Sequence, residues 1–181
     1  QGTRAIGMGG ALRASATGES ALLLNPAGMT LSRTYSIHGL YQYRAGDSAS
    51  LANSSIVDSV TSSLAAGLFY SFSHASPSRT LALGGGKTFD LDETVQTHEA
   101  GLALAYPLLS MLHLGVSAKY LHESVEQPKG TPEVAKREGN SGFSLDAGAI
   151  LTPWAGLRIG VVGHNLVPAE SDRFPMRLGL G

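Results

Sequence analysis

The chain has no cysteine among its 181 residues, which excludes disulfide bonds, thiolate metal sites and thiol catalysis. Charged residues are scarce, at 15% against about 25% in typical soluble domains. Thirteen basic and fourteen acidic residues leave a net charge of −1, so no basic field favours nucleic acid. No stretch approaches the roughly 18 apolar residues that a transmembrane helix needs. A chain this poor in charge needs surroundings other than water for much of its surface.

Glycine is abundant, with 23 residues, and the chain after residue 33 alternates apolar side chains with small or polar ones. Such alternation is typical of strands with two unlike faces. Eight strands are predicted, over residues 34–44, 62–74, 79–88, 98–108, 112–122, 143–152, 157–162 and 174–181. Their lengths are those of strands that cross a bilayer at a tilt of about 45°.

The connections between these strands alternate in length. Long segments are expected at residues 45–61, 89–97 and 123–140, and short ones at 75–78, 109–111 and 153–156. Short turns at one end and long polar loops at the other are typical of transmembrane β-barrels. The predicted fold is therefore an all-β, antiparallel outer-membrane barrel with a periplasmic N-terminus.

Several aromatic residues fall near strand ends on the apolar faces. They are Tyr41, Tyr43, Phe72, Tyr106 and Tyr120. They fit an interfacial girdle of a barrel, and ordinary lipid-facing or core aromatics fit equally well. Trp154, in a short turn, is expected at the periplasmic interface.

The other strand faces hold mostly glycine, alanine and serine with isolated charges of both signs. We expect these charges to point into a packed polar lumen; they are Glu99, Lys119, Asp146, Arg158 and Arg177. On the opposite faces, Leu114, Leu145 and Ile159 are expected to meet lipid, where a charge is costly. A soluble antiparallel sandwich is the alternative, because its strands alternate too. The composition favours the barrel, since a sandwich carries charge on its exposed strand faces.

Residues 1–33 show neither clean alternation nor a long helical stripe. They contain Arg4-Ala5-Ile6-Gly7-Met8-Gly9-Gly10-Ala11, then Ser20-Ala21, then Asn25-Pro26-Ala27-Gly28. This run resembles the mature N-terminus of the FadL/PorV-like outer-membrane barrel superfamily. The departure is Ala16-Thr17-Gly18-Glu19, where members often carry an Asp pair.

The resemblance implies a hatch or plug, residues 1–33, inside a barrel of about fourteen strands to which residues 34–181 contribute about eight. An eight-stranded barrel is filled by its own side chains, so the hatch requires the larger one. The C-terminal strands are then expected to be missing from this chain. The expected location is the outer membrane of a Gram-negative bacterium, after removal of a signal peptide. Asn25-Pro26-Ala27-Gly28 is expected to form a fixed turn after a short helix that begins near Ser20.

Motifs for catalysis and cofactor binding are weak. Gly86-Lys87-Thr88 mimics the end of a phosphate-binding loop, but Leu81 stands where the first glycine is needed. The six histidines show no metal-ligand spacing. We therefore expect no enzyme, cofactor, metal site or nucleic-acid partner, and contact with outer-membrane lipid.

Two functions follow from the resemblance. As in the FadL branch, the barrel passes hydrophobic small molecules inward through an apolar pocket between hatch and wall. The candidate residues for plug and ligand are Leu22, Leu23, Leu24, Asn25, Pro26, Met29, Leu40 and Phe69. As in the PorV branch, the barrel instead anchors other cell-envelope proteins of a secretion, motility or surface-assembly machine.

Each function has a simpler alternative. The hydrophobic residues of the hatch equally fit a role in fixing it to the wall. The polar loop Ser124–Asn140, which would contact partner proteins, equally fits plain solvation. Transport is favoured because the hatch motif is the best-defined feature, and the sequence names neither a ligand nor a partner.

Overall fold

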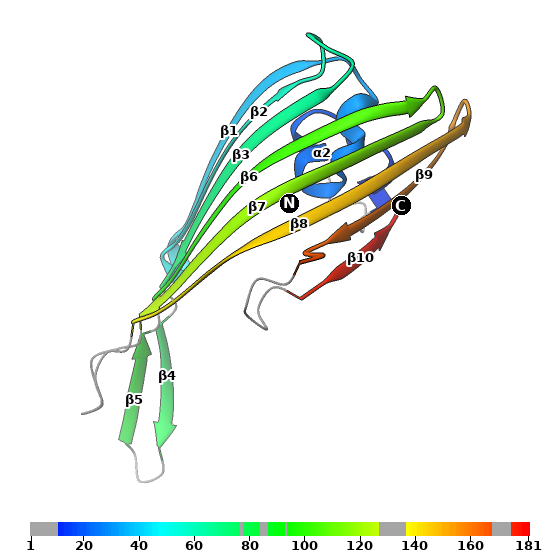
Figure 1. Cartoon of the computed structure of the whole chain (residues 1–181). Coiled ribbons are helices and arrows are strands. Elements are labelled where there is room, and N and C mark those ends of the chain that lie inside the picture. The colour runs from blue at the N-terminus through cyan, green and yellow to red at the C-terminus, as the bar shows by residue number, and fades with distance from the viewer. Residues whose placement is uncertain (1–10, 77, 84–86, 93, 127–136, 168–174) are drawn as a thin grey trace.

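A computed structural model describes residues 11–76, 78–83, 87–92, 94–126, 137–167 and 175–181. Eight strands form one antiparallel sheet in the order β1-β2-β3-β6-β7-β8-β9-β10, while β4 and β5 form a separate two-stranded hairpin. The sheet curves around the short N-terminal helices, which lie on its concave face (Figure 1). The strands are β1 Tyr35–Arg44, β2 Ala49–Asp58, β3 Ala65–Ala75, β4 Ser78–Leu83, β5 Lys87–Asp92, β6 Thr94–Leu109, β7 Leu112–Glu126, β8 Arg137–Trp154, β9 Leu157–His164 and β10 Arg177–Leu180.

The all-β class and the eight-stranded antiparallel sheet are confirmed. The sheet is not closed into a barrel, because β1 and β10 stand at the two ends of its strand order. Across the described ranges, no helix has the length and apolar character needed to cross a membrane.

Two predicted segments between Arg44 and Thr94 are wrong. The loop expected over residues 45–61 contains β2, which pairs with β1 and β3. The strand expected over residues 79–88 instead divides between β4 and β5, outside the main sheet. One strand of the main sheet was missed and one was predicted in error, so the sheet still has eight strands. The direction predicted for β3, however, is the reverse of the observed one. Its end at Ala75 therefore lies beside the far end of β7, not among the short turns.

The strands from β6 to β8 are longer than predicted. β7 continues to Glu126 and β8 begins at Arg137, so the loop predicted over residues 123–140 is shorter, and its centre lies outside the described residues. The predicted tight turn between β6 and β7 is confirmed. The turn predicted over residues 153–156 is shorter in the structure and consists of Ala155 and Gly156. Gly156 has a φ of 96°, a conformation that favours glycine.

The alternation divides the sheet into two faces as predicted. One row on the convex face joins directly paired residues across six strands: Ile37, Ile56, Leu68, Leu102, Ala118 and Leu145. Leu68, Leu102 and Leu145 are about half exposed, at 55%, 51% and 47%. The neighbours of Leu68, Leu102 and Leu145 that point to the concave face are buried, among them Phe69, Ala103 and Ser144. The apolar face of the sheet is therefore the open one.

A disulfide cross-link tests the register of β2, the strand that the sequence did not predict. Gln42 and Leu51 are direct partners across β1 and β2. Paired Cα atoms in antiparallel strands lie about 4.5–5.5 Å apart, within disulfide range. We expect the double variant Gln42→Cys/Leu51→Cys to lose its free thiols on mild oxidation, measured by thiol labelling in a chain with no other cysteine.

The matched control is Gln42→Cys/Ala52→Cys, which differs by one residue. A shift of one residue turns the second side chain to the opposite face, so this pair should stay reduced. Equal oxidation of both pairs would mean that residues 45–61 form a mobile loop after all.

Candidate functional site

The N-terminal segment, residues 11–30, consists of three short helices. They are η1 Ala11–Ala14, α2 Glu19–Leu24 and η2 Pro26–Thr30. As predicted, the helix stops before Pro26: α2 ends at Leu24, because Asn25, the residue preceding the proline, is disfavoured in the helical region. Asn25 is extended, and its Oδ1 accepts a hydrogen bond from the Ala27 amide at 3.2 Å. The predicted turn at Asn25-Pro26-Ala27-Gly28 is therefore present.

The wall under this segment is built from a row of mostly small residues. This small-residue row joins directly paired residues across six strands: Ala65, Ala105, Gly115, Gly148, Val162 and Gly179. A Cβ atom at Gly115 would collide with the backbone of Pro26 and Ala27, and one at Gly148 with the side chain of Asn25. The N-terminal segment can therefore approach the sheet backbone closely only because these positions lack side chains.

The hydrophobic candidates are brought together, with one exception. Leu22, Met29 and Phe69 are at most 2% exposed and belong to one apolar cluster with Leu24. Leu23 packs against this cluster from its edge. Leu40 lies on the concave face of β1, but it is 37% exposed and outside the cluster. In this arrangement the hydrophobes hold the segment to the wall.

Few polar bonds join the N-terminal segment to the wall within the described residues. The side-chain amide of Asn25, itself fully buried, donates to the carbonyls of Ala149 and Val161, both at 3.4 Å. Thr30 Oγ1 contacts His113 Nδ1 at 2.7 Å. Most of the attachment is therefore apolar contact.

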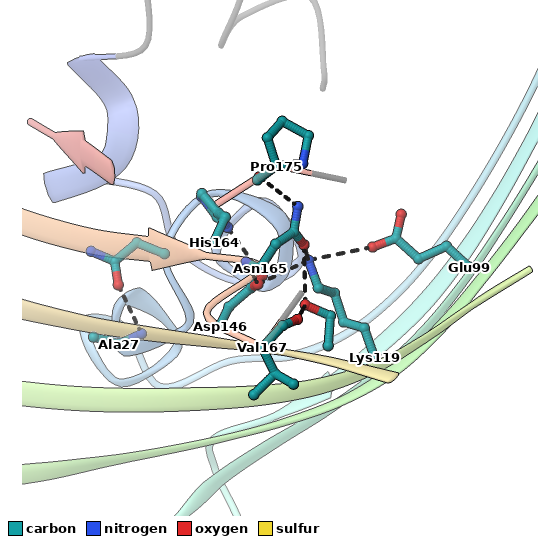
Figure 2. A network of polar contacts seen from close by, with 10 residues as sticks. Ala27, Glu99, Lys119, Asp146, His164, Asn165, Val167 and Pro175 are labelled. Atoms are coloured by element: carbon teal, nitrogen blue, oxygen red, sulfur yellow. Dashed lines mark hydrogen bonds and ion pairs between the residues drawn. The ribbon is translucent and has the colours of Figure 1, made fainter. Parts of the chain in front are cut away.

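A second assembly, the polar cluster, lies on the same face of β6, β7 and β8 (Figure 2). Lys119 Nζ lies 2.9 Å from Asp146 Oδ1 and 3.8 Å from Glu99 Oε1. Asp146 also accepts bonds from the Asn165 amide, at 2.9 Å, and faces His164 Nδ1 at 3.0 Å. Lys119 and Asp146 are 8% and 3% exposed. Each buried charge thus has an opposite charge and additional hydrogen bonds, as burial requires.

The polar cluster also holds the chain that follows β9. Asn165, with a φ of 54°, accepts a bond from Lys119 Nζ at 3.0 Å and donates to the Pro175 carbonyl at 3.3 Å. Ser144 Oγ donates to the Val167 carbonyl at 2.9 Å. Residues 165–167 are therefore drawn onto the concave face.

Of the five predicted lumen charges, the structure unites Glu99, Lys119 and Asp146. Arg158 lies away from them in a pocket beside His113, and Arg177 is exposed on β10. Sequence reasoning missed His164 and Asn165. One signal was present: an asparagine lies three residues after the strand predicted over residues 157–162, and asparagine is favoured where the chain turns through a left-handed conformation.

The arrangement supports structure more than chemistry. The carboxylate of Asp146 and the ammonium of Lys119 bind each other, and both bind Asn165. In the part of the chain that the structure describes, no three potential metal ligands come together. The polar cluster therefore fits a role in fixing the wall and the chain after β9.

Protein-family models, curated proteins and solved structures all fail to match this chain. The resemblance to FadL/PorV-like proteins therefore rests on the motif of residues 4–28, of which residues 4–10 lie outside the described part. Function has to be inferred from the two faces of the sheet and from the segment that covers one of them.

We expect the two carboxylates near Lys119, those of Asp146 and Glu99, to contribute unequally to stability, and two conservative variants test this. Asp146→Asn removes the charge nearest to Lys119 and leaves a buried ammonium without it. We expect a loss of about 3 kcal/mol in the free energy of unfolding, measured by denaturant titration. Glu99→Gln, at a more distant and more exposed site, should cost less than about 1 kcal/mol. Equal losses would show that the two carboxylates share Lys119 equally.

Proposed function

We propose that this chain forms wall and plug of an outer-membrane β-barrel, similar to FadL/PorV-like proteins, that passes hydrophobic small molecules across the outer membrane. The observation that carries the proposal is the open apolar face. Large hydrophobic side chains on the convex face are exposed on β1, β3, β6, β7, β8, β9 and β10, for example Ile37 at 73%, Phe143 at 73% and Leu178 at 76%. Soluble proteins rarely expose contiguous apolar patches above a few hundred Å². Lipid is the solvent that suits such a face.

The aromatic residues support a membrane position. Tyr70, Tyr120 and Phe143 stand at one level of the convex face, since Tyr70 and Tyr120 both pair with Ala100, and Tyr120 with Phe143. Trp154, 66% exposed, stands eleven residues beyond Phe143 in β8. Eleven steps of about 3.3 Å at a tilt of about 40° span about 28 Å, close to the apolar band of about 25 Å between aromatic girdles.

The open edges support closure by further strands. Among the described residues, β1 and β10 each pair with a strand on one side alone, which leaves backbone amides and carbonyls of the other side without a strand partner. In hydrocarbon each unpaired group costs several kcal/mol, so a membrane sheet has to close. A barrel larger than eight strands would also give the N-terminal segment the room that it occupies here.

The N-terminal segment supports transport because of where it lies. In a closed barrel the concave face becomes the lumen, and the segment would block it. Its attachment is mainly apolar contact with the small-residue row, supplemented by the bonds of Asn25 and Thr30.

An outer-membrane scaffold is the second candidate. The β4–β5 hairpin extends beyond the end of the main sheet (Figure 1). This is the end opposite the tight turns, which would face outward in the proposed topology. A projecting hairpin is a natural contact for another cell-envelope protein.

The membrane assignment is tested by arginine at two neighbouring positions of β1. Ile37 is on the convex face, in the row with Leu68 and Leu102, whereas His38 is exposed on the concave face. In lipid vesicles we expect Ile37→Arg to lower the free energy of unfolding by about 2–4 kcal/mol and His38→Arg to change it little. Equal tolerance of both would show that the convex face does not meet lipid and would favour a soluble sheet.

The plug is tested by glycine substitutions in the full-length chain. Gly115→Val should push the N-terminal segment off the wall, while Gly39→Val, with open space around it, is the matched control. We expect Gly115→Val, and removal of residues 1–30, to raise the single-channel conductance for small solutes, and Gly39→Val to leave it unchanged. An intact protein that already conducts like an open porin would contradict the plug. A folded but sealed truncation would instead favour the scaffold.

A further inference from the structure

A pocket of about 360 Å³ opens at the end of the sheet where the tight turns lie. It is separate from the apolar cluster and the polar cluster described above. Its lining includes Leu31, His113, Trp154, Leu157 and Arg158. Its volume lies within the range of about 300–1,000 Å³ that is usual for small-ligand sites.

Arg158 supplies a positive charge to this pocket. It is on the concave face, since Gly160, two residues on, faces Ala14 of the N-terminal segment. Its side chain is exposed, and the structure gives it no carboxylate partner among the described residues. A guanidinium with an open fork is suited to bidentate binding of a carboxylate.

His113 supplies a hydrogen-bond acceptor next to this charge. The hydroxyl of Thr30 donates its one hydrogen to the Ala27 carbonyl at 2.9 Å, so it accepts from His113 Nδ1, 2.7 Å away. In the neutral ring the proton is then on Nδ1, and Nε2 is an acceptor. Within the described residues no donor bonds to Nε2. His113 is 9% exposed and held in one orientation.

We propose that this pocket binds a carboxylate that carries an N–H donor and an apolar group beside it. Arg158 binds the carboxylate, Nε2 of His113 accepts from the N–H, and Leu31, Leu157 and the ring of Trp154 contact the apolar group. An N-acylated amino acid and the C-terminal residue of a polypeptide share this chemistry. The inference goes beyond the proposed function, because it depends on neither lipid nor transport.

Trp154 is the single tryptophan of the chain and lines this pocket, so a ligand bound there should change its fluorescence. The experiment titrates the full chain in detergent micelles with N-acetyl-leucine. We expect a saturable change in emission, and no change with N-acetyl-leucinamide, which lacks the carboxylate. Arg158→Gln should weaken binding about tenfold to a hundredfold. Arg177→Gln, an exposed arginine on the same face but outside the pocket, should leave binding unchanged.

Equal binding of the acid and the amide, no binding of either, or undiminished binding by Arg158→Gln would each overturn the proposal. The acceptor role of His113 has its own test in 4-methylpentanoate, which keeps the carboxylate and the apolar group but lacks the N–H. It should bind several-fold more weakly than N-acetyl-leucine. Equal affinity would overturn the proposal that Arg158 and His113 both bind the ligand.

A second titration distinguishes between the two sources of the carboxylate, a polypeptide C-terminus and a small N-acylated acid. Tighter binding of acetyl-Ala-Ala-Leu than of N-acetyl-leucine would assign the site to a polypeptide C-terminus. Equal or weaker binding of the peptide would assign it to a small N-acylated acid. Because the measurement is made in micelles, failure of the lipid and conductance tests would leave its result intact.

Discussion

The close approach of the N-terminal segment to the sheet backbone is the contact on which the rest of the structure depends. It brings the turn Asn25-Pro26-Ala27 against Gly115 and Gly148, where any side chain would collide. At this distance the segment excludes water from the middle of the concave face. The apolar cluster around Leu22 and Met29 follows from this exclusion, as does the burial of Asn25, whose polar atoms are satisfied by its own turn and by strand carbonyls.

Exclusion of water also explains the composition of the polar cluster. A buried ammonium is tolerated only with a charged partner and further hydrogen bonds, and Lys119 has Asp146 and Asn165. Since the same carboxylate binds the backbone of Asn165, the electrostatics of the wall and the course of the chain after β9 are linked. The middle of the concave face is thus used for internal contacts, and the convex apolar face is left for external ones.

The two faces together limit the functions that the chain can have. A sheet with its small and polar face covered from within and its apolar face open is suited to lipid. The pocket beside Arg158 adds a site outside the apolar cluster and the polar cluster. It combines a cation, an acceptor and an aromatic ring at the rim of the concave face, where a soluble compound or a chain terminus has access.

The sequence by itself determined the features that depend on local chemistry. A period of two sorted side chains such as Ile37 and His38 to opposite faces, and Pro26 ended the short helix through its effect on Asn25. The sequence did not reveal β2, because serine and alanine occupy both of its faces and hide the alternation. Nor did it show that residues 79–88 belong to a separate hairpin, since strand propensity does not name a pairing partner.

Only the tertiary structure decided which distant residues meet. Glu99, Lys119 and Asp146 lie on three strands, and the register of these strands brings them together in one cluster. Arg158 and Arg177 lie outside it. The pairing of His113 with Thr30 needs the N-terminal segment folded back across the sheet. The physical reason is that periodicity and turn preference act over a few residues. Register, close backbone approach and the exclusion of water arise only when the strands are assembled.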